Sequence, residues 1–133
     1  MDNCIFCKII KDEIPSFKIA EDNEFLAFLS IAPINPGHTL IIPKTHSEYL
    51  FDSGDEILSK ILIFAKPVTN ALEKVVKPKT GKVGVMVAGL EVPHTHIHLI
   101  PMDSEGDLTF EKAKPANMEE LKQIAESVKN KVT

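Results

Sequence analysis

The apolar residues of the chain gather in short runs that turn-forming residues separate. The first two runs flank Glu21-Asp22-Asn23, and together they predict a β-hairpin. A later run begins at His38 and ends at Pro43, a pattern typical of a short buried strand that a proline terminates. The runs that we predict to be strands are 17–20, 25–29, 38–43, 82–87 and 95–101.

A helical pattern opens with Ser53 and Glu56, which have the spacing of a capping box. Apolar side chains then recur at helical spacing at Ile57, Ile61, Phe64, Ala65, Val68, Ala71, Leu72 and Val75. We expect a kink or a break at Pro67, because this residue lacks a backbone N–H and crowds the carbonyl of Ile63. Pro78 prevents the helix from continuing.

A last helix is predicted from Asn117, which caps it together with Glu120. Its apolar positions are Leu121, Ile124, Ala125 and Val128. The order along the chain is therefore strands, helix, strands, helix, and the connections are too short for parallel crossovers. This order predicts an α+β fold with an antiparallel sheet, and a length of 133 residues suits a single domain spanning residues 1–133.

The charged residues indicate how the chain can bind phosphate groups and nucleic acids. The fifteen basic residues are all lysine, so no guanidinium can grip a phosphate with two hydrogen bonds. A formal net charge of −4 also argues against binding a nucleic-acid polymer through a broad basic surface. We find no apolar run long enough for a membrane span and no pattern of a signal peptide, so we expect no membrane partner and a cytoplasmic location.

The chemistry of the chain concentrates in its histidines and cysteines. His94, His96 and His98 alternate, so a strand would place all three imidazoles on one face, about 6.6 Å apart. Such a row suits either a metal site or catalysis in which one neutral imidazole attacks and its neighbours move protons. Cys4 and Cys7 form a Cys-x-x-Cys pair, which in a reducing compartment is more often metal-binding or redox-active than a structural disulfide.

Taken together, these motifs resemble the histidine triad (HIT) superfamily of nucleotide hydrolases and transferases, in its bacterial type with an N-terminal Cys-x-x-Cys. The segments that carry the resemblance are 4–10, 13–15, 21–22, 26–28, 36–46 and 94–100. The similarity runs from about residue 4 to 101, and residues 102–133 form a helical extension without a family motif. The resemblance implies a five-stranded antiparallel sheet with helices packed on it, an extra C-terminal helix, and a homodimer with the helix of residues 53–76 at the contact.

The same resemblance implies an activity and the residues that carry it. The expected enzyme cleaves a phosphoramidate, a mononucleotide ester or a dinucleoside polyphosphate at the α-phosphate, through a nucleotidyl-histidine intermediate. The implied catalytic residues are His96 as the nucleophile, His98, which contacts the phosphate and helps with proton transfer, and His38, which completes the histidine set that shapes the phosphate site. The implied nucleotide-binding residues are Ile5, Phe6, Ile9, Phe28, Ile31 and Gly89.

The implied cofactor is a structural zinc ion held by Cys4, Cys7, His46 and His94, and no organic cofactor is expected. A catalytic zinc held by the three histidines of residues 94–98 is an alternative that leaves the cysteines without a role. The sequence departs from the family at Ser30, Leu90 and Glu91, where members usually carry residues that bind ribose and phosphate. These departures motivate a second hypothesis, a zinc-stabilised nucleotide-binding or interaction module with little catalysis.

Overall fold

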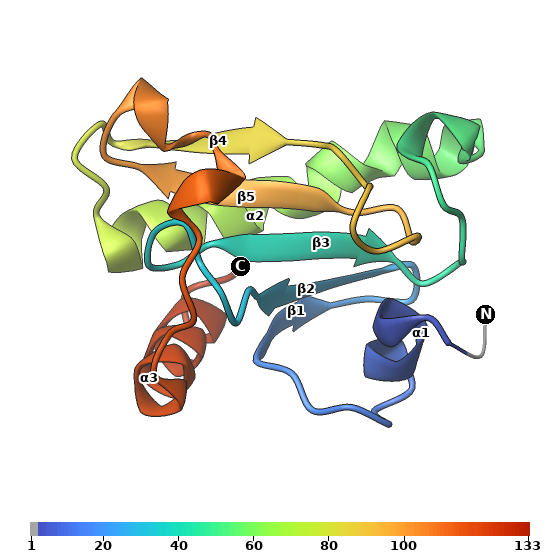
Figure 1. Cartoon of the computed structure of the whole chain (residues 1–133), viewed down its shortest axis with the longest axis horizontal. Helices are drawn as coiled ribbons and strands as arrows, with labels where there is room; N and C mark the ends of the chain where they lie inside the picture. The colour runs from blue at the N-terminus through green and yellow to red at the C-terminus, as the bar shows by residue number, and fades with distance from the viewer. Residues whose placement is uncertain (1–2) are drawn as a thin grey trace.

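The computed structural model describes residues 3–133 and contains one five-stranded antiparallel sheet with strand order β1-β2-β3-β5-β4 (Figure 1). The predicted α+β fold, with its antiparallel sheet and C-terminal helix, is therefore confirmed. The strands are β1 (Lys18–Glu21), β2 (Phe25–Leu29), β3 (Thr39–Pro43), β4 (Lys82–Met86) and β5 (Ile97–Met102). The helices are α1 (Ile5–Ile10), α2 (Asp55–Val76) and α3 (Met118–Lys129), with short 3-10 turns η1 (Leu50–Asp52), η2 (Glu105–Asp107) and η3 (Phe110–Lys112).

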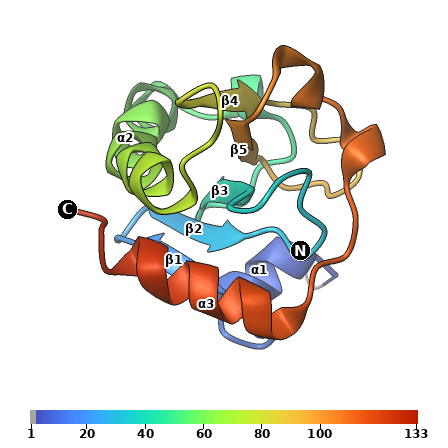
Figure 2. The same cartoon turned by 90° about the vertical axis from the view of Figure 1, so that its left-hand side faces the viewer.

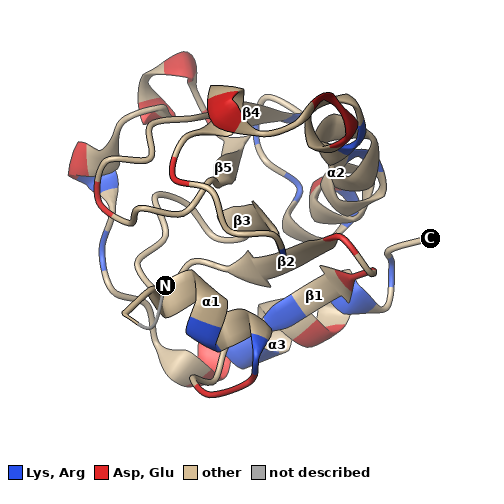
Figure 3. Ribbon diagram, turned by 90° about the vertical axis from the view of Figure 1, so that its right-hand side faces the viewer, with Lys and Arg blue, Asp and Glu red and all other residues tan. Residues whose placement is uncertain are grey.

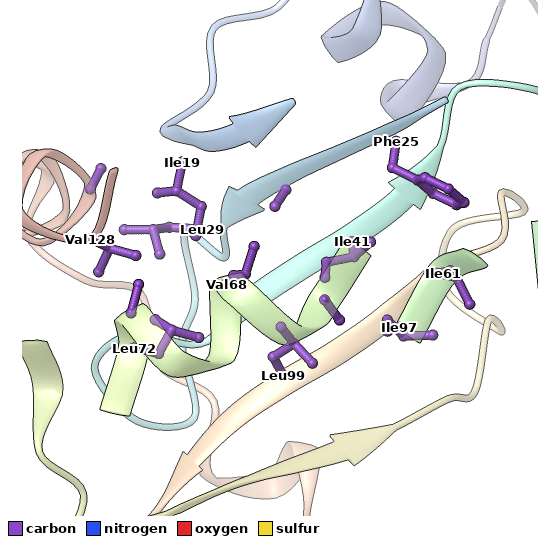
Figure 4. Packing of buried hydrophobic residues seen from close by; sticks show 14 of the residues in the cluster. Ile19, Phe25, Leu29, Ile41, Ile61, Val68, Leu72, Ile97, Leu99 and Val128 are labelled. Carbon is purple, nitrogen blue, oxygen red and sulfur yellow. The ribbon is translucent and has the colours of Figure 1, made fainter. Parts of the chain in front are cut away.

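Two apolar layers cover the two faces of the sheet. Successive residues of a strand point to opposite faces, and every residue of β2 and β3 is buried, so both faces are apolar. Phe25, Leu29 and Ile41 pack with α2 and α3 in the larger layer (Figure 4). Leu26 and Phe28 belong to the second layer, which α1 covers. Strands β2, β3 and β5 carry no lysine, aspartate or glutamate, and Figure 3 shows them as an uncharged interior. The sheet is thus a rigid base between a helical layer and the site described below.

Helix α2 departs from the sequence prediction in two respects. Its N-cap is Gly54 and no side chain caps it, whereas the Ser53 hydroxyl lies 3.2 Å from that of Ser47, so the predicted capping box is wrong. The helix also runs through Pro67 without a break. Buried residues on both sides of Pro67, among them Ala65 and Val68, hold the helix on the sheet.

The ends of several elements also differ from the prediction. Strand β5 begins at Ile97 and not at Thr95, whose backbone N–H instead donates to the carbonyl of Ser47 over 2.6 Å. Helix α1 was not predicted, although Cys4 caps it by accepting the N–H of Cys7 at its sulfur. At α3 the prediction is confirmed, because the Asn117 side chain accepts the first free N–H groups of the helix. None of the helices in residues 3–133 is both long and apolar enough to cross a membrane.

Candidate active site and metal centre

A cavity of about 610 Å³ opens between α1, β2 and the beginning of β5. His96 immediately precedes β5 and His98 is its second residue, and both imidazoles line this cavity together with His38. The six other residues expected to contact a nucleotide also line this cavity. They are Ile5, Phe6, Ile9, Phe28, Ile31 and Gly89. The structure therefore brings all nine of the residues expected at the nucleotide site into one cavity.

The imidazoles of His38 and His98 form a directed chain of hydrogen bonds. The backbone N–H of Ile34 donates to Nδ1 of His38 over 3.0 Å, so the ring proton of His38 lies on Nε2. That Nε2–H lies 3.0 Å from Nδ1 of His98 and donates to it. The proton of a neutral His98 is consequently on Nε2, where it is a donor for a bound anion.

Burial keeps both of these imidazoles neutral near pH 7. Desolvation lowers the pKa of His38 to about 4. Burial, helped by the neighbouring His38 and His96, lowers the pKa of His98 to about 3. The pair therefore offers a fixed N–H donor and not a positive charge.

His96 is held in the tautomer that a nucleophile needs. Its Nδ1 lies 2.7 Å from the backbone carbonyl of His94, and a carbonyl only accepts, so Nδ1 carries the proton. The lone pair of Nε2 is then free. The edges of Phe6 and His98 flank the ring, with centroid distances of 5.1 Å and 4.9 Å. These contacts fix the orientation of the imidazole within the cavity.

A second cluster joins the N-terminus to the loop before β5. Cys4, Cys7, His46 and His94 place one donor atom each within 4.8 Å of one another, so the cluster could bind a metal ion. Nδ1 of His94 lies 3.4 Å from the sulfur of Cys4, 3.6 Å from that of Cys7 and 3.2 Å from Nδ1 of His46. Nε2 of His94 lies 2.8 Å from the carbonyl of Pro43 and donates to it, which leaves Nδ1 unprotonated and free for a metal.

His94 does not share the environment of the other two triad histidines, so the prediction of one common strand face is wrong for this residue. It precedes β5, is fully buried and lies outside the cavity lining, because its two ring nitrogens are committed to Pro43 and to the cysteine cluster. Within residues 3–133, the donor group that could hold a metal contains His94 and excludes His96 and His98. A single metal ion held by the three histidines is therefore not favoured.

Several residues that line the cavity were not predicted from the sequence. Ile14, Pro15 and Ser16 approach it from the segment after α1, and the Glu13-Ile14-Pro15 motif was an available signal for them. Phe110 and Ala113 reach it from the segment after β5, where no motif marked them. Leu90 is almost fully exposed at the cavity.

Comparison with known proteins decides the family. The model of the HIT domain family matches residues 11–105, more than half of the chain. The chain belongs to the HIT family. An uncharacterised HIT-like protein of Borreliella burgdorferi is 41% identical over 124 residues, which cover 90% of this chain and 89% of that one.

Two further relatives bear on the site. The adenosine 5'-monophosphoramidase of Schizosaccharomyces pombe is 38% identical over 135 residues, which cover 98% of each chain. The crystal structure of a zinc-bound histidine triad family protein from Mycobacterium smegmatis superimposes with a TM-score of 0.80 at 27% identity, over 97% of this chain and 94% of that one. The similarity to each of these two proteins covers nearly the whole chain, so it extends beyond residues 4–101 into the C-terminal helix.

Proposed function

We propose that this HIT protein is a nucleotide hydrolase or nucleotidyl transferase that cleaves its substrate at the α-phosphate through a nucleotidyl-His96 intermediate. The observation that carries the proposal is the free Nε2 of His96, which the carbonyl of His94 holds in its nucleophilic tautomer at the wall of an apolar cavity. The name of the fission-yeast relative, an adenosine 5'-monophosphoramidase, supports a nucleoside phosphoramidate as the first substrate to test.

The first chemical step is attack of His96 Nε2 on the α-phosphorus. The bond from phosphorus to the leaving group breaks with its electron pair, and an amine leaving group takes up a proton from solvent. The imidazole becomes positively charged when it bonds to phosphorus, and the carbonyl of His94, 2.7 Å from Nδ1, stabilises that charge. Water then attacks phosphorus, the N–P bond breaks toward Nε2, and a proton is released with the nucleotide.

The α-phosphate oxygens need hydrogen-bond donors during both steps. We assign this role to Nε2–H of His98, which His38 orients by donating to Nδ1. Neither arginine nor lysine is among the cavity-lining residues, so a bound phosphate depends on uncharged donors, namely imidazole, hydroxyl and backbone N–H groups. We assign a further donor role to the backbone N–H of Gly89, a cavity-lining residue with a positive φ of 76° and no side chain to keep a phosphate away.

The apolar part of the cavity suits the base and the sugar. We assign Phe6 and Ile9 of α1 and Phe28 of β2, whose ring meets that of Phe6 edge-on with centroids 5.6 Å apart, to one apolar wall against which the nucleoside packs. Ile5 and Ile31 lie at the exposed rim of the cavity. The hydroxyl of Ser30 already accepts the N–H of Ala32 over 3.2 Å, so it keeps one proton to donate to a sugar.

We propose that the cysteine cluster holds a structural zinc ion. Zinc with Zn–N near 2.0 Å and Zn–S near 2.3 Å in a tetrahedron requires N···N distances of about 3.3 Å and N···S distances of about 3.5 Å. The observed separations of 3.2 Å between the two Nδ1 atoms and 3.3 Å from Cys7 Sγ to His46 Nδ1 match these values. When bound, zinc would cross-link the N-terminal segment to the loop that carries His94 and His96. Cys4 and Cys7 form no disulfide, which also fits the cytoplasmic location that we propose.

We also propose a homodimer formed through β4 and α2. Strand β4 is one of the two edge strands of the sheet, and Val85 on it is 47% exposed. Leu62 and Ile63 on α2 are exposed by 60% and 71%. An open strand edge beside apolar helix residues is the kind of surface that a second copy covers in a symmetric dimer.

Turnover of a substrate panel tests the activity. We expect the zinc-loaded protein to hydrolyse adenosine or guanosine phosphoramidate, and dinucleoside polyphosphates serve as the comparison substrates. His96→Ala should lower kcat by about a thousandfold or more, because the nucleophile is lost. A mass increase of one nucleotidyl group should be trapped on the wild-type protein and be absent from the variant.

Two controls separate the possible outcomes. Thermal unfolding and binding of AMP must show that His96→Ala is folded and retains the cavity. Equal turnover by this variant would refute the assignment of the nucleophile. Binding of AMP without turnover of any substrate by the wild-type protein would select the non-catalytic nucleotide-binding module instead.

A further inference from the structure

Residues 103–116 connect β5 to α3 and pass beside the cavity. We call this segment the strap. Figure 2 shows it descending along one side of the molecule from the end of β5 to the start of α3. The strap contains η2 and η3, and two of its residues, Phe110 and Ala113, line the cavity. It lies in the part of the chain that carries no motif, so its contacts must define any role.

The carboxylate of Asp107 is the anchor of the strap. It is buried, 6% exposed, and it accepts the backbone N–H groups of Asp103 and Ser104 over 2.7 Å and 3.0 Å. The amide of Asn35 donates to it over 2.9 Å and Lys112 over 2.9 Å. These donors, with that of Lys112 the strongest, hold the pKa of Asp107 well below its usual range, so the anchor is charged at every pH of interest.

The anchor ties the strap to the loop that carries His38. The second hydrogen of the Asn35 amide donates to the carbonyl of Pro101 over 2.8 Å, so Asn35 bridges β5 and the strap. Two backbone bonds continue the connection, from Lys114 to Pro33 over 3.2 Å and from Ala116 to Ile31 over 3.0 Å. The loop of residues 31–38 and the strap are therefore joined along their length.

Phe110 extends from this fixed segment to the imidazole of His98. Its ring lies edge-on to the imidazole of His98, with centroids 4.8 Å apart and an interplanar angle of 66°. Phe110 is 42% exposed and belongs to neither of the two apolar layers of the sheet. A partly exposed phenylalanine outside the core adds little to stability, so its contact with His98 is the property that stands out.

We propose that Phe110 is a positioning residue for His98, and that Asp107 holds Phe110 in place by anchoring the strap. This proposal rests on the proposed function, because it assigns Phe110 to the group that binds the α-phosphate. The hydrogen bond from His38 to Nδ1 and the edge contact with His96, with centroids 4.9 Å apart, hold the imidazole of His98 from two directions and leave a third to the strap. The Phe110 ring restrains the imidazole from that third direction, so Nε2–H stays directed into the cavity.

Steady-state kinetics of the zinc-loaded protein on adenosine phosphoramidate test this arrangement. We expect Phe110→Ala and Asp107→Asn each to lower kcat about tenfold, because a misplaced donor weakens stabilisation of the transition state. KM should change by less than about twofold, since the apolar base pocket is intact. The double variant should be no slower than either single variant, because both changes release the same ring.

Matched controls separate positioning from general damage. Phe51→Ala removes a phenylalanine that is 68% exposed and outside the cavity lining, and Asp103→Asn changes a carboxylate on the strap whose side chain does not contact Asp107. Both should keep kcat within about twofold. If Asp107→Asn fails to fold, Lys112→Met replaces it, because this variant removes a half-exposed partner of the same carboxylate.

A spectroscopic readout makes the test independent of activity. In a ¹H–¹⁵N spectrum of the histidine rings, Phe110→Ala should shift the nitrogens of His98 while those of His46 stay in place. Unchanged His98 signals, a kcat equal to that of the controls, or additive losses of about a hundredfold in the double variant would each overturn the proposal. If the wild-type protein lacks turnover, the proposed function fails, and the His98 signals alone decide the role of Phe110.

Discussion

At the residue scale, hydrogen bonds to backbone carbonyl and N–H groups determine which ring nitrogen of His38, His94 and His96 carries the proton. His94 and His96 each donate one ring proton to a carbonyl, yet opposite ring nitrogens are left free. The free atom of His94 is Nδ1, which faces the cysteines, whereas that of His96 is Nε2 at the cavity. His38 differs from both, because its Nδ1 accepts a backbone N–H and its Nε2–H donates a hydrogen bond to His98. In the proposed function, one residue type thus supplies a metal ligand at the cysteine cluster and both a nucleophile and a hydrogen-bond donor at the cavity.

The proposed zinc site leads to a prediction at the same scale. Cys4→Ser should reduce the bound zinc from about one ion per chain to a small fraction, because the tetrahedral set loses a thiolate. Without the ion, burial raises the pKa of the Cys7 thiol, so the remaining ligands bind more weakly at neutral pH. Elemental analysis after dialysis, combined with the unfolding temperature, measures both effects.

A variant of the proposed nucleophile is the matched control for the zinc prediction. His96→Ala should keep its zinc, because His96 lies outside the donor cluster. Loss of zinc from this variant, or full retention by Cys4→Ser, would contradict the assignment.

Motifs located the site residues better than strand periodicity did. Every residue that the family pattern assigned to the nucleotide lies at the cavity. Alternation alone put His94 on the same face as His96 and His98, and this was wrong because β5 begins only at Ile97. Phe110 could not be found from the sequence, since its role depends on hydrogen bonds of Asp107 to a residue 72 positions away along the chain.

At the element scale, tertiary packing overrides local preference in α2. The helix spans 22 residues through Pro67, because Ala65, Val68 and Leu72 are buried against the sheet on either side of it. The Ser53 capping signal failed for a related reason, since the Ser53 hydroxyl is engaged by Ser47 and Gly54 becomes the N-cap. Local signals in the sequence therefore predicted the existence of this helix correctly. They did not predict its first residue or its continuity through Pro67.

Replacing Pro67 tests whether packing compensates for a real local cost. Pro67→Ala should raise the free energy of unfolding by about 1–2 kcal/mol, because alanine restores a helical N–H and removes the clash with the preceding turn. The gain is below the full propensity difference, since alanine also frees the unfolded chain. Urea unfolding at constant m-value measures the change, and the neighbouring exposed Lys66→Ala is the control. A stability equal to or below that of the wild-type protein would show that the proline costs nothing here.

At the scale of the whole molecule, the two edges of the sheet differ in how they are covered. The β1 edge lies beside α3, which packs against β1. The β4 edge borders a groove of about 580 Å³ against α2, lined by Leu62, Thr69 and Val85 among others. The cavity with His96 opens elsewhere and shares none of the residues of this groove. A second copy could therefore cover β4 without blocking the site.

The proposed dimer leads to the last prediction. Leu62→Lys and Val85→Lys together should weaken association at least about a hundredfold, because two charges per chain would be buried against their symmetry mates. Sedimentation equilibrium at micromolar concentration should then show a dimer for the wild-type protein and a monomer for this variant. Met118→Lys, which adds the same charge at an exposed position on α3, should remain a dimer. A wild-type protein that sediments as a monomer would exclude this interface, whereas a dimer that survives both lysines would place the contact on another surface.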